Sequence, residues 1–254
     1  MEGNFQAGPG AAALAGAHAA CAQWSVIPDE PDRAPRLRPL GDAAVLIEVA
    51  DEVGDASHRA VNAASAALAG GADAVQLEVV PAYTTIAVHY DPQHFAHGGG
   101  SPYAQVCALI ERLLREATRG EAMPVQTVEI PVRYGGADGP DLDDVARHAD
   151  LDADSVVRLH AAGEYTVQMI GFVPGFPYLS GLPACLATPR RASPRLRVAP
   201  GTVGIAGVQT GIYPLETPGG WQLIGRTDVQ LFRPDRDPPV LLRVGDRVRF
   251  VAVA

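Results

Sequence analysis

The fold of this chain is decided by the stretch A-P-G-T-V-G-I-A-G-V-Q-T-G-I-Y-P, residues 199–214. Short apolar runs alternate there with glycines at positions 201, 204, 207 and 211. The same texture of short strands with Gly or Pro turns extends from Glu164 to Val253. It predicts a closed or nearly closed β-barrel. Strands interrupted by glycine usually lie where another backbone or a ligand approaches closely.

The region before the barrel has the pattern of a small α+β sandwich. We predict a strand over residues 45–49, a helix over 55–69 ended by Gly70-Gly71, and a hairpin of strands over 75–80 and 84–90. A second helix over 101–118 begins with Ser101 as its cap and Pro102 at the first helical position. The order is βαββα, and residues 128–132 are a possible further strand.

These patterns predict an α+β class chain divided into three parts. Residues 1–35, rich in Ala, Gly and Pro, are expected to be a disordered tail. Residues 36–120 form the N-terminal α+β domain, and residues 127–254 the barrel domain, joined by a short linker. Two short helices are expected over 141–149 and 152–162, before the barrel's Gly-rich strands.

Composition excludes several kinds of function. The formal net charge of -9 makes a broad nucleic-acid-binding surface a poor expectation. The 20 basic residues are all arginine. Without lysine there is no Schiff base, no P-loop lysine and no attachment point for biotin or lipoate. His94 and His97 have a metal-site spacing without an evident third ligand, so we predict no metal site.

Targeting signals are also missing. Glu2 is the sole charge before the Ala-rich run 11–22, so that run lacks the basic start of a signal peptide. No apolar run reaches the ~20 residues that a membrane span needs. The three cysteines are widely spaced, as expected of reduced thiols. We therefore expect a cytoplasmic protein that does not enter a membrane.

An aromatic loop is the first candidate site. The stretch M-I-G-F-V-P-G-F-P-Y-L-S-G-L, residues 169–182, follows directly on an apolar strand. Gly175 permits unusual backbone geometry, and the two prolines stiffen the loop. Phe172, Phe176 and Tyr178 can then form a pocket wall or a partner-binding surface. The alternative is an aromatic plug that closes one end of the barrel.

Arginines and polar residues give further candidates. Arg190, Arg191, Arg195 and Arg197 lie within eight positions of each other, and arginine forks suit phosphate or carboxylate. A solvated basic turn is the alternative. The glycine-rich strands and the segment after them add Gln209, Thr210, Tyr213, Trp221 and Arg226. His160 is either a proton carrier or a histidine that packs a helix.

Four motifs carry a family resemblance. They are G-F-V-P-G-F-P-Y-L from Gly171, T-P-R from Thr188, G-x-x-G-I-A-G-x-Q-T-G-I-Y-P from Gly201 and P-G-G-W-Q-L-I-G-R-T from Pro218. Their order resembles the allophanate hydrolase subunit 1 family, with its carboxyltransferase subdomains C and D. That family includes the 5-oxoprolinase B subunit and the KipI-type inhibitor of a histidine kinase. The resemblance extends from about Arg36 to the end.

Departures from the family pattern are few. The family usually shows P-A-G-S where this chain has Ala199-Pro200-Gly201-Thr202. It often has glycine at the position of Val208 and serine at that of Thr217. The first difference affects the turn at Gly201 and the backbone contacts expected there.

The resemblance implies a cyclophilin-like barrel behind the α+β domain, and a two-subunit enzyme. The partner would be a second cyclophilin-like subunit on another chain (the 5-oxoprolinase C subunit or allophanate hydrolase subunit 2), with a third, lactam-opening subunit. ATP with Mg²⁺ would be the co-substrate, with no covalent cofactor on this chain. The expected reaction is cleavage of 5-oxoproline to L-glutamate through lactam phosphorylation, with no activity in the isolated chain.

Within that reaction the candidates take distinct roles. We expect Arg190, Arg195 and Arg226 to hold the transferring phosphate and His160 to carry a proton. The substrate would meet eight residues: Phe172, Gly175, Phe176, Tyr178, Gln209, Thr210, Tyr213 and Trp221. Two other functions remain open: a KipI-type kinase inhibitor, and half of a biotin-dependent carboxyltransferase acting on urea or allophanate-type amides.

Overall fold

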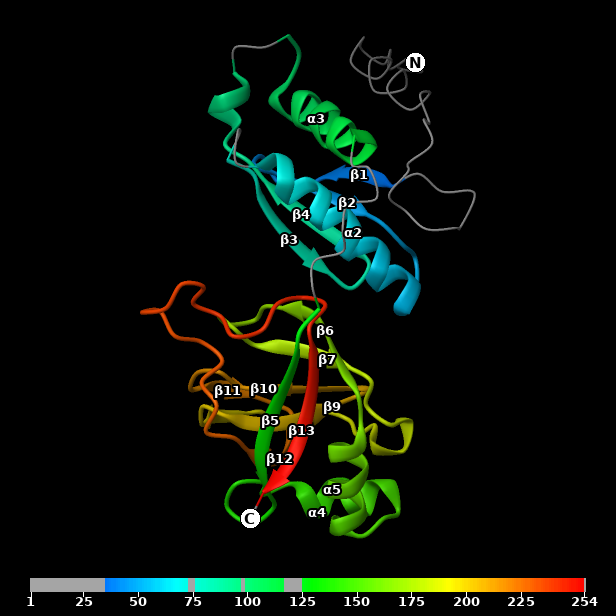
Figure 1. Ribbon diagram of the computed structural model, residues 1–254, viewed down its shortest axis with the longest axis vertical. Helices are drawn as coiled ribbons and strands as arrows, with labels where there is room; N and C mark the ends of the chain where they lie inside the picture. The colour runs from blue at the N-terminus through cyan, green and yellow to red at the C-terminus, as the bar shows by residue number, and fades with distance from the viewer. Residues whose placement is uncertain (1–34, 73–75, 97–98, 117–124, 254) are drawn as a thin grey trace, which may run out of the picture.

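The computed structural model describes residues 35–72, 76–96, 99–116 and 125–253. The predicted tail of residues 1–35 lies outside these ranges apart from its last residue, as does most of the predicted linker. The described chain forms an N-terminal α+β domain and a β-barrel, which are the upper and lower parts of Figure 1.

The N-terminal domain is a four-stranded antiparallel sheet of order β1-β2-β4-β3 with two helices on one face. Its elements are β1 (Arg36–Pro39), β2 (Ala44–Glu48), α2 (Asp55–Ala72), β3 (Glu78–Ala82), β4 (Thr85–His89), the 3-10 turn η2 (Pro92–Phe95) and α3 (Pro102–Glu116). The alternating residues Val45, Ile47, Ile86 and Val88 are fully buried beneath the helices, as an amphipathic sheet requires. The predicted cap of α3 is present, because Ser101 Oγ accepts from the Ala104 N–H at 3.2 Å.

Two details of this domain differ from the sequence prediction. The order is ββαββα, because R-L-R-P forms the edge strand β1, and arginines and proline are tolerated at a sheet edge. Helix α2 continues through Gly70-Gly71 to Ala72. A Cβ at Gly71 would overlap the Leu113 side chain of α3, so this glycine allows two helices to approach and does not end one.

The second domain contains a closed seven-stranded barrel of order β10-β7-β6-β13-β5-β12-β9. The elements of this domain are β5 (Thr127–Tyr134), α4 (Leu142–Ala149), α5 (Ala153–Ala162), β6 (Tyr165–Ile170), β7 (Pro177–Ser180), the 3-10 turn η3 (Ala184–Leu186), β8 (Arg195–Val198), β9 (Thr202–Ala206), β10 (Gln209–Ile212), β11 (Thr217–Gly219), β12 (Gln222–Arg226) and β13 (Arg247–Val253). The strand predicted over residues 128–132 is β5. It pairs in parallel with β13 and antiparallel with β12, so it belongs to the barrel and adds nothing to the N-terminal sheet.

Apolar side chains that point inward fill the barrel. Ile130, Val167, Leu179, Val203 and Phe250 come from five different strands and are almost completely buried. Helices α4 and α5 were predicted as two short helices, and they lie at the end of the barrel away from the N-terminal domain (Figure 1). This core is separate from that of the N-terminal domain.

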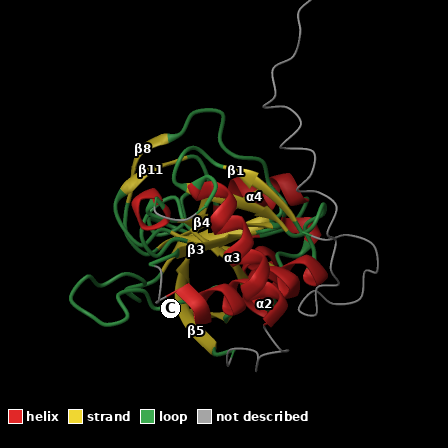
Figure 2. Ribbon diagram, turned by 90° about the horizontal axis from the view of Figure 1, so that it is seen from above, coloured by secondary structure: helices red, strands yellow, loops and turns green. Residues whose placement is uncertain are grey.

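A two-stranded ribbon, β8 paired with β11, lies outside the barrel wall. Figure 2 shows these two strands side by side at the edge of the molecule. Between ribbon and barrel lies a third apolar cluster that includes Phe176, Tyr213 and Trp221. Strand β9 is therefore buried on both faces, which explains its continuous run of buried residues.

The described residues include contacts between the two domains. Strand β3 contacts β6. Gln209 of β10 donates from Nε2 to the phenol oxygen of Tyr83, between β3 and β4. Gly245 lies beside the Asn62 side chain of α2. Among the described helices, none is both long and apolar enough to cross a membrane.

Candidate functional site

The predicted aromatic residues form one cluster on the outer wall of the barrel. Phe176 is its centre, with ring centroids 5.7 Å from Phe172, 4.8 Å from Tyr178, 5.2 Å from Tyr213 and 5.4 Å from Trp221. Most of these pairs are edge-to-face, the arrangement that aromatic quadrupoles favour. The sequence therefore selected a real spatial group, although it lies on a wall of the barrel and does not plug an end.

Glycines in the strands beneath make room for this cluster. A Cβ at Gly204 would lie 3.1 Å from Trp221 Cβ, and one at Gly211 would lie 3.1 Å from both Phe176 Cζ and Trp221 Cζ3. Gly175, with φ +80°, would place a Cβ 3.0 Å from Phe232 Cβ and 3.3 Å from the Leu231 oxygen. A close approach by a ligand or another backbone was expected at the Gly-rich strands. It is largely aromatic side chains of this same chain that approach them.

Only part of the cluster is accessible. Phe176 and Tyr213 are each 1% exposed and Trp221 5%, so they form a floor. Tyr178 is half-buried and Phe172 is 60% exposed. Phe172 also has φ +71°, a left-handed conformation that non-glycine residues rarely adopt. Backbone strain of this kind is concentrated at ligand and partner sites.

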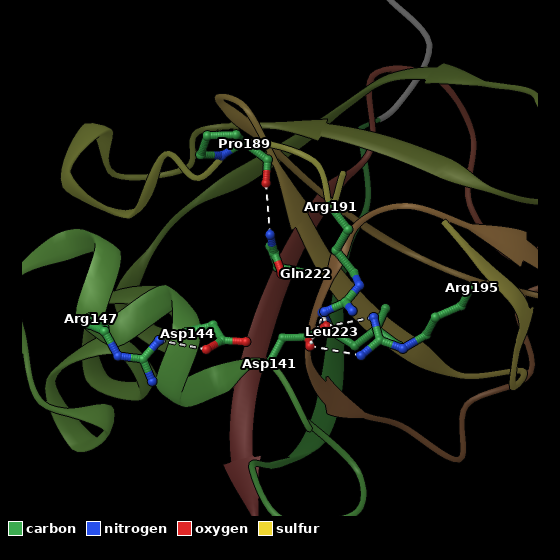
Figure 3. A network of polar contacts seen from close by, with 8 residues as sticks. All are labelled: Asp141, Asp144, Arg147, Pro189, Arg191, Arg195, Gln222 and Leu223. Atoms are coloured by element: carbon green, nitrogen blue, oxygen red, sulfur yellow. Dashed lines mark hydrogen bonds and ion pairs between the residues drawn. The ribbon is translucent and has the colours of Figure 1, made fainter. Parts of the chain in front are cut away.

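The arginine segment is anchored by a buried carboxylate (Figure 3). Asp141, 2% exposed, accepts two hydrogen bonds from Arg195 at 2.8 and 2.9 Å and one from Arg191 at 3.0 Å. The Leu223 N–H also donates to it at 2.7 Å. The segment is therefore fixed, in contrast to the solvated turn that was the alternative to an anion site. Arg195, expected to hold phosphate, already has its fork on Asp141.

This anchoring leaves one arginine of the segment unengaged. Gln222 donates to the Pro189 carbonyl at 2.9 Å and the Arg191 N–H donates to the Gly220 carbonyl at 2.8 Å, so both sides of Arg190 are fixed. Within the part of the chain that the structure describes, Arg190 has no hydrogen bond or ion pair of its own. Its guanidinium is exposed and available to an anion.

The charge of Arg190 acts on the aromatic face. Burial raises the pKa of Tyr178, and the positive charge of Arg190 partly offsets that rise. Burial raises the pKa of Tyr213 to about 12, with Arg190 again opposing the rise. Both phenols are therefore neutral hydrogen-bond donors near neutral pH. Arg190, Tyr178 and the aromatic floor belong to one surface.

Gln209 and Tyr83 extend this surface to the N-terminal domain. Gln209 points outward from β10 and bonds the Tyr83 hydroxyl. Burial raises the pKa of Tyr83, Gln209 lowers it and the nearby Tyr178 raises it further. Sequence reasoning missed Tyr83. No local signal in the sequence shows that the tip of this hairpin meets the barrel.

Thr210 and His160 lie inside the barrel, away from this surface. His160 is completely buried, its Nδ1 is 2.8 Å from the Tyr134 hydroxyl and its Nε2 is 3.0 Å from Thr210 Oγ1. Thr210 donates to the Gly204 carbonyl, so it accepts from Nε2–H, and Nδ1 accepts from Tyr134. Burial lowers the pKa of His160 to about 3. This neutral, enclosed ring fits the packing alternative, and the geometry gives no support to a proton carrier.

Arg226 lies apart from the other candidates. Its Nε donates to the Pro200 carbonyl at 3.2 Å, and it lines a depression of about 600 Å³ with Gly201, Asp228 and Arg233. Asp228 is held by Arg133 and Asp235 by Arg233, so this depression carries balanced charge. The three predicted catalytic arginines therefore lie in three different environments. Of the three, only Arg190 faces the aromatic surface without a partner among the described residues.

No group of three or more His, Cys, Asp or Glu in the described ranges could hold a metal ion, and His97 is outside those ranges. The accessible surface of the described residues instead combines the Arg190 guanidinium, neutral phenols, an amide and an aromatic floor. Such a set suits a small anion with an apolar ring. We refer to Arg190, Tyr178, Gln209 and Tyr83, above this floor, as the barrel-face site.

Curated relatives match nearly the whole described chain. The 5-oxoprolinase B subunit of Bacillus subtilis (strain 168) is 43% identical over 223 residues, which cover 86% of this chain and 93% of that protein. The 5-oxoprolinase B subunit of Escherichia coli O157:H7 is 47% identical over 214 residues, which cover 84% and 93%. Both alignments include both domains described above.

Solved structures share the fold. The crystal structure of TTHA0988 matches with a TM-score of 0.71 and 37% identity over 84% of this chain, which spans only 40% of that one. The Kluyveromyces lactis urea carboxylase matches with a TM-score of 0.64 at 19% identity, covering 90% of this chain and 23% of that one, and shows the fold alone. A family profile described as carboxyltransferase domain, subdomain C and D, matches residues 35–242. The chain therefore belongs to the family of carboxyltransferase domains, subdomains C and D.

Proposed function

We propose that this chain is the B subunit of an ATP-dependent 5-oxoprolinase, which cleaves 5-oxoproline to L-glutamate. One observation carries the proposal: two proteins named as this 5-oxoprolinase component are 43% and 47% identical to it over 86% and 84% of its length. Likeness to urea carboxylase, at 19% identity, supports a common fold and gives no separate support to carboxyl transfer.

The chemistry explains the need for cations and donors. The amide of 5-oxoproline is unstrained, so hydrolysis is slow until its oxygen receives the γ-phosphoryl group of ATP. Water then adds to the activated carbon, and the ring C–N bond breaks with protonation of nitrogen, which leaves an acyl phosphate. A second water hydrolyses this acyl phosphate to the free carboxylate and phosphate. Developing charge on the phosphoryl oxygens and the substrate carboxylate both require cationic partners.

Arg190 is the residue of this chain best placed for that work. Its guanidinium is free and lies on the same surface as Tyr178. Asp141, Arg191 and Arg195 position it by fixing the segment. We propose that a second cyclophilin-like protein completes the site and that a third subunit takes part in opening the lactam. ATP enters with Mg²⁺ as co-substrate.

The test is reconstitution. The purified chain, its second and third subunits and the three together are assayed for ATP hydrolysis with and without 5-oxoproline, and for glutamate release. We expect 5-oxoproline-dependent turnover in the full mixture and none in the chain alone. Robust lactam-stimulated hydrolysis by the isolated chain, or none in the full mixture, would contradict the proposal.

Arg190 gives a sharper test of the site. Replacing Arg190 with alanine or lysine should lower turnover of the full complex by at least about tenfold, because lysine keeps the charge but loses the planar fork. Arg197→Ala is the matched control, since Arg197 is exposed and pairs with exposed Glu216. The melting temperature of all three variants should stay near wild type. Unchanged turnover in both Arg190 variants would remove Arg190 from the site.

A further inference from the structure

One buried amide on the barrel wall has an unmet hydrogen bond. Gln168 of β6 is 4% exposed, and its Nε2 donates to Ser180 Oγ at 2.7 Å. Its Oε1 is buried and has no hydrogen-bond partner among the residues that the structure describes. If the amide is turned over, the unmet bond falls on the nitrogen, so one amide atom stays unsatisfied either way. Such a buried polar atom requires a water or a ligand group.

Strand register places this amide beside the barrel-face site. Thr210 of β10 is paired with Leu179 of β7, so the preceding Gln209 lies opposite Ser180. Gln168 bonds Ser180 from the other neighbouring strand. Gln168, Ser180 and Gln209 therefore form one polar row across β6, β7 and β10. Tyr178 is two positions from Ser180 and on the same face of β7.

The N-terminal domain covers one end of this row. Strand β3 contacts β6, and the Tyr83 hydroxyl accepts from Gln209. Because Gln209 donates to the phenol oxygen, the phenol hydrogen of Tyr83 stays available to a ligand. Figure 1 shows β6 and β7 at the end of the barrel that faces β3. Gln168 is buried, so a ligand reaches its amide only when the residues that cover it move away.

We propose that this row is a recognition site for a cyclic amide, with Gln168 bonding one group of the lactam and Tyr83 donating to its carbonyl. The inference rests on the proposed function and gives the N-terminal domain a direct part in it. A lactam amide is cis, so its N–H and C=O lie on the same side and can meet two neighbouring protein groups. Arg190, near Tyr178 on the same surface, is then available to the substrate carboxylate.

The first measurement separates binding from turnover in the reconstituted complex. Gln168→Leu and Tyr83→Phe should each raise the KM for 5-oxoproline about tenfold, the value of one hydrogen bond to a buried group, with kcat changed much less. Gln105→Leu and Tyr90→Phe are the matched controls. They remove a bonded amide and a bonded hydroxyl within the N-terminal domain, and both should keep the wild-type KM.

The second measurement needs no turnover. In ¹H–¹⁵N spectra of the full chain, the side-chain amide signal of Gln168 is identified by its loss in Gln168→Leu or Gln168→Glu. It should shift on addition of 2-pyrrolidone or 5-oxoproline and not on addition of proline, which has the ring and carboxylate but no lactam. This probe keeps the test valid if a variant folds poorly.

The outcomes separate the two proposals. If the wild-type complex turns over 5-oxoproline while Gln168→Leu and Tyr83→Phe keep its KM, the cyclic-amide site is overturned and the proposed function stands. If the wild-type complex does not use 5-oxoproline, the proposed function fails and the spectra decide. A shift of the Gln168 signal with 2-pyrrolidone supports the site. An unchanged signal, as expected if a bound water satisfies the Gln168 amide, overturns it.

Discussion

Asp141 holds two arginines at a buried position, where a charge without a partner strongly destabilises the fold. Its carboxylate is 2% exposed, and Arg195 and Arg191 bring two positive charges to it. Removing one partner from a buried ion pair costs more than the pair gains, because the remaining charge stays uncompensated. This residue therefore controls the geometry of the whole arginine segment.

Asp141→Asn should lower the free energy of unfolding by about 3 kcal/mol, because two partly buried guanidiniums lose their counter-charge. Urea unfolding monitored by circular dichroism measures it. Arg197→Ala, at an exposed ion pair, should change the same quantity by less than about 1 kcal/mol. Equal losses in the two variants would show that Asp141 is not the anchor.

His160 makes stability depend on pH. Burial lowers its folded-state pKa to about 3, whereas an unfolded chain has the ordinary value near 6.5. Below pH 6.5 the unfolded state binds a proton that the folded state does not, so stability falls as the pH drops toward 3. The slope of this contribution is at most about 1.4 kcal/mol per pH unit.

His160→Asn should remove that contribution. Between pH 7 and pH 5 the wild type should lose about 2 kcal/mol more of its unfolding free energy than the variant does, although the variant is less stable at pH 7. Urea unfolding at both pH values gives the comparison, with the exposed His148→Asn as control. Parallel losses in wild type and His160→Asn would mean that His160 titrates normally in the fold.

At the scale of elements, Gly201 joins three parts of the barrel. Its N–H donates to the Tyr213 carbonyl at 2.7 Å and its own carbonyl accepts from the Thr227 N–H at 2.9 Å. It has φ +81°, and a Cβ there would overlap the Thr227 carbonyl oxygen. The A-P-G-T variation before β9 therefore keeps a glycine whose backbone contacts are fully formed.

Gly201→Ala should cost about 3 kcal/mol, from a left-handed conformation together with a backbone clash. Gly207→Ala is the matched control. Gly207 has φ +56° with nothing within 4 Å of its added Cβ, so only the conformational cost of about 1 kcal/mol remains. The difference in melting temperature between the two variants measures the clash. A Gly201→Ala protein as stable as Gly207→Ala would show that β12 can move away.

The sequence predicted elements well where one local signal governed them. Ser101, the expected cap, and Asp152, at the expected start of the helix over 152–162, each accept a bond from a nearby N–H group. Asp141 has the same position before α4 but makes no such bond, because Arg191 and Arg195 compete for its carboxylate. These arginines are 50 and 54 positions away in the sequence, so the local pattern around Asp141 could not predict these ion pairs.

In the candidate site, too, the sequence predicted the features that have a distinctive local signal and missed the others. The aromatic group was predicted because its motifs are distinctive, and Phe176 does contact Tyr178, Tyr213 and Trp221. Inward and outward positions on β10 were not separated, so Thr210 was grouped with Gln209 although one faces the core and the other the surface. A short strand of four residues has too little alternation to show its faces.

On the scale of the whole molecule, two separate cores predict two unfolding events. Ile86 belongs to the N-terminal core and Ile130 to the barrel core, and both are 0% exposed. Ile86→Ala and Ile130→Ala should each cost about 2–5 kcal/mol, in different domains. Calorimetry should show two transitions, with each variant lowering one of them. A single transition lowered equally by both would show that the interdomain contacts couple the cores.

The parallel pairing of β5 with β13 affects how the protein is made. These strands lie about 120 positions apart, and their contacts include the bond from Arg249 to Glu129. A ribosome releases Thr127–Tyr134 long before Gln222–Arg226 and Arg247–Val253, so β5 waits without either neighbouring strand while the intervening segment is translated. The N-terminal domain meets no such delay. Barrel closure is therefore a late event of biosynthesis, and until then the nascent β5 edge is open to chaperones or to pairing with another chain.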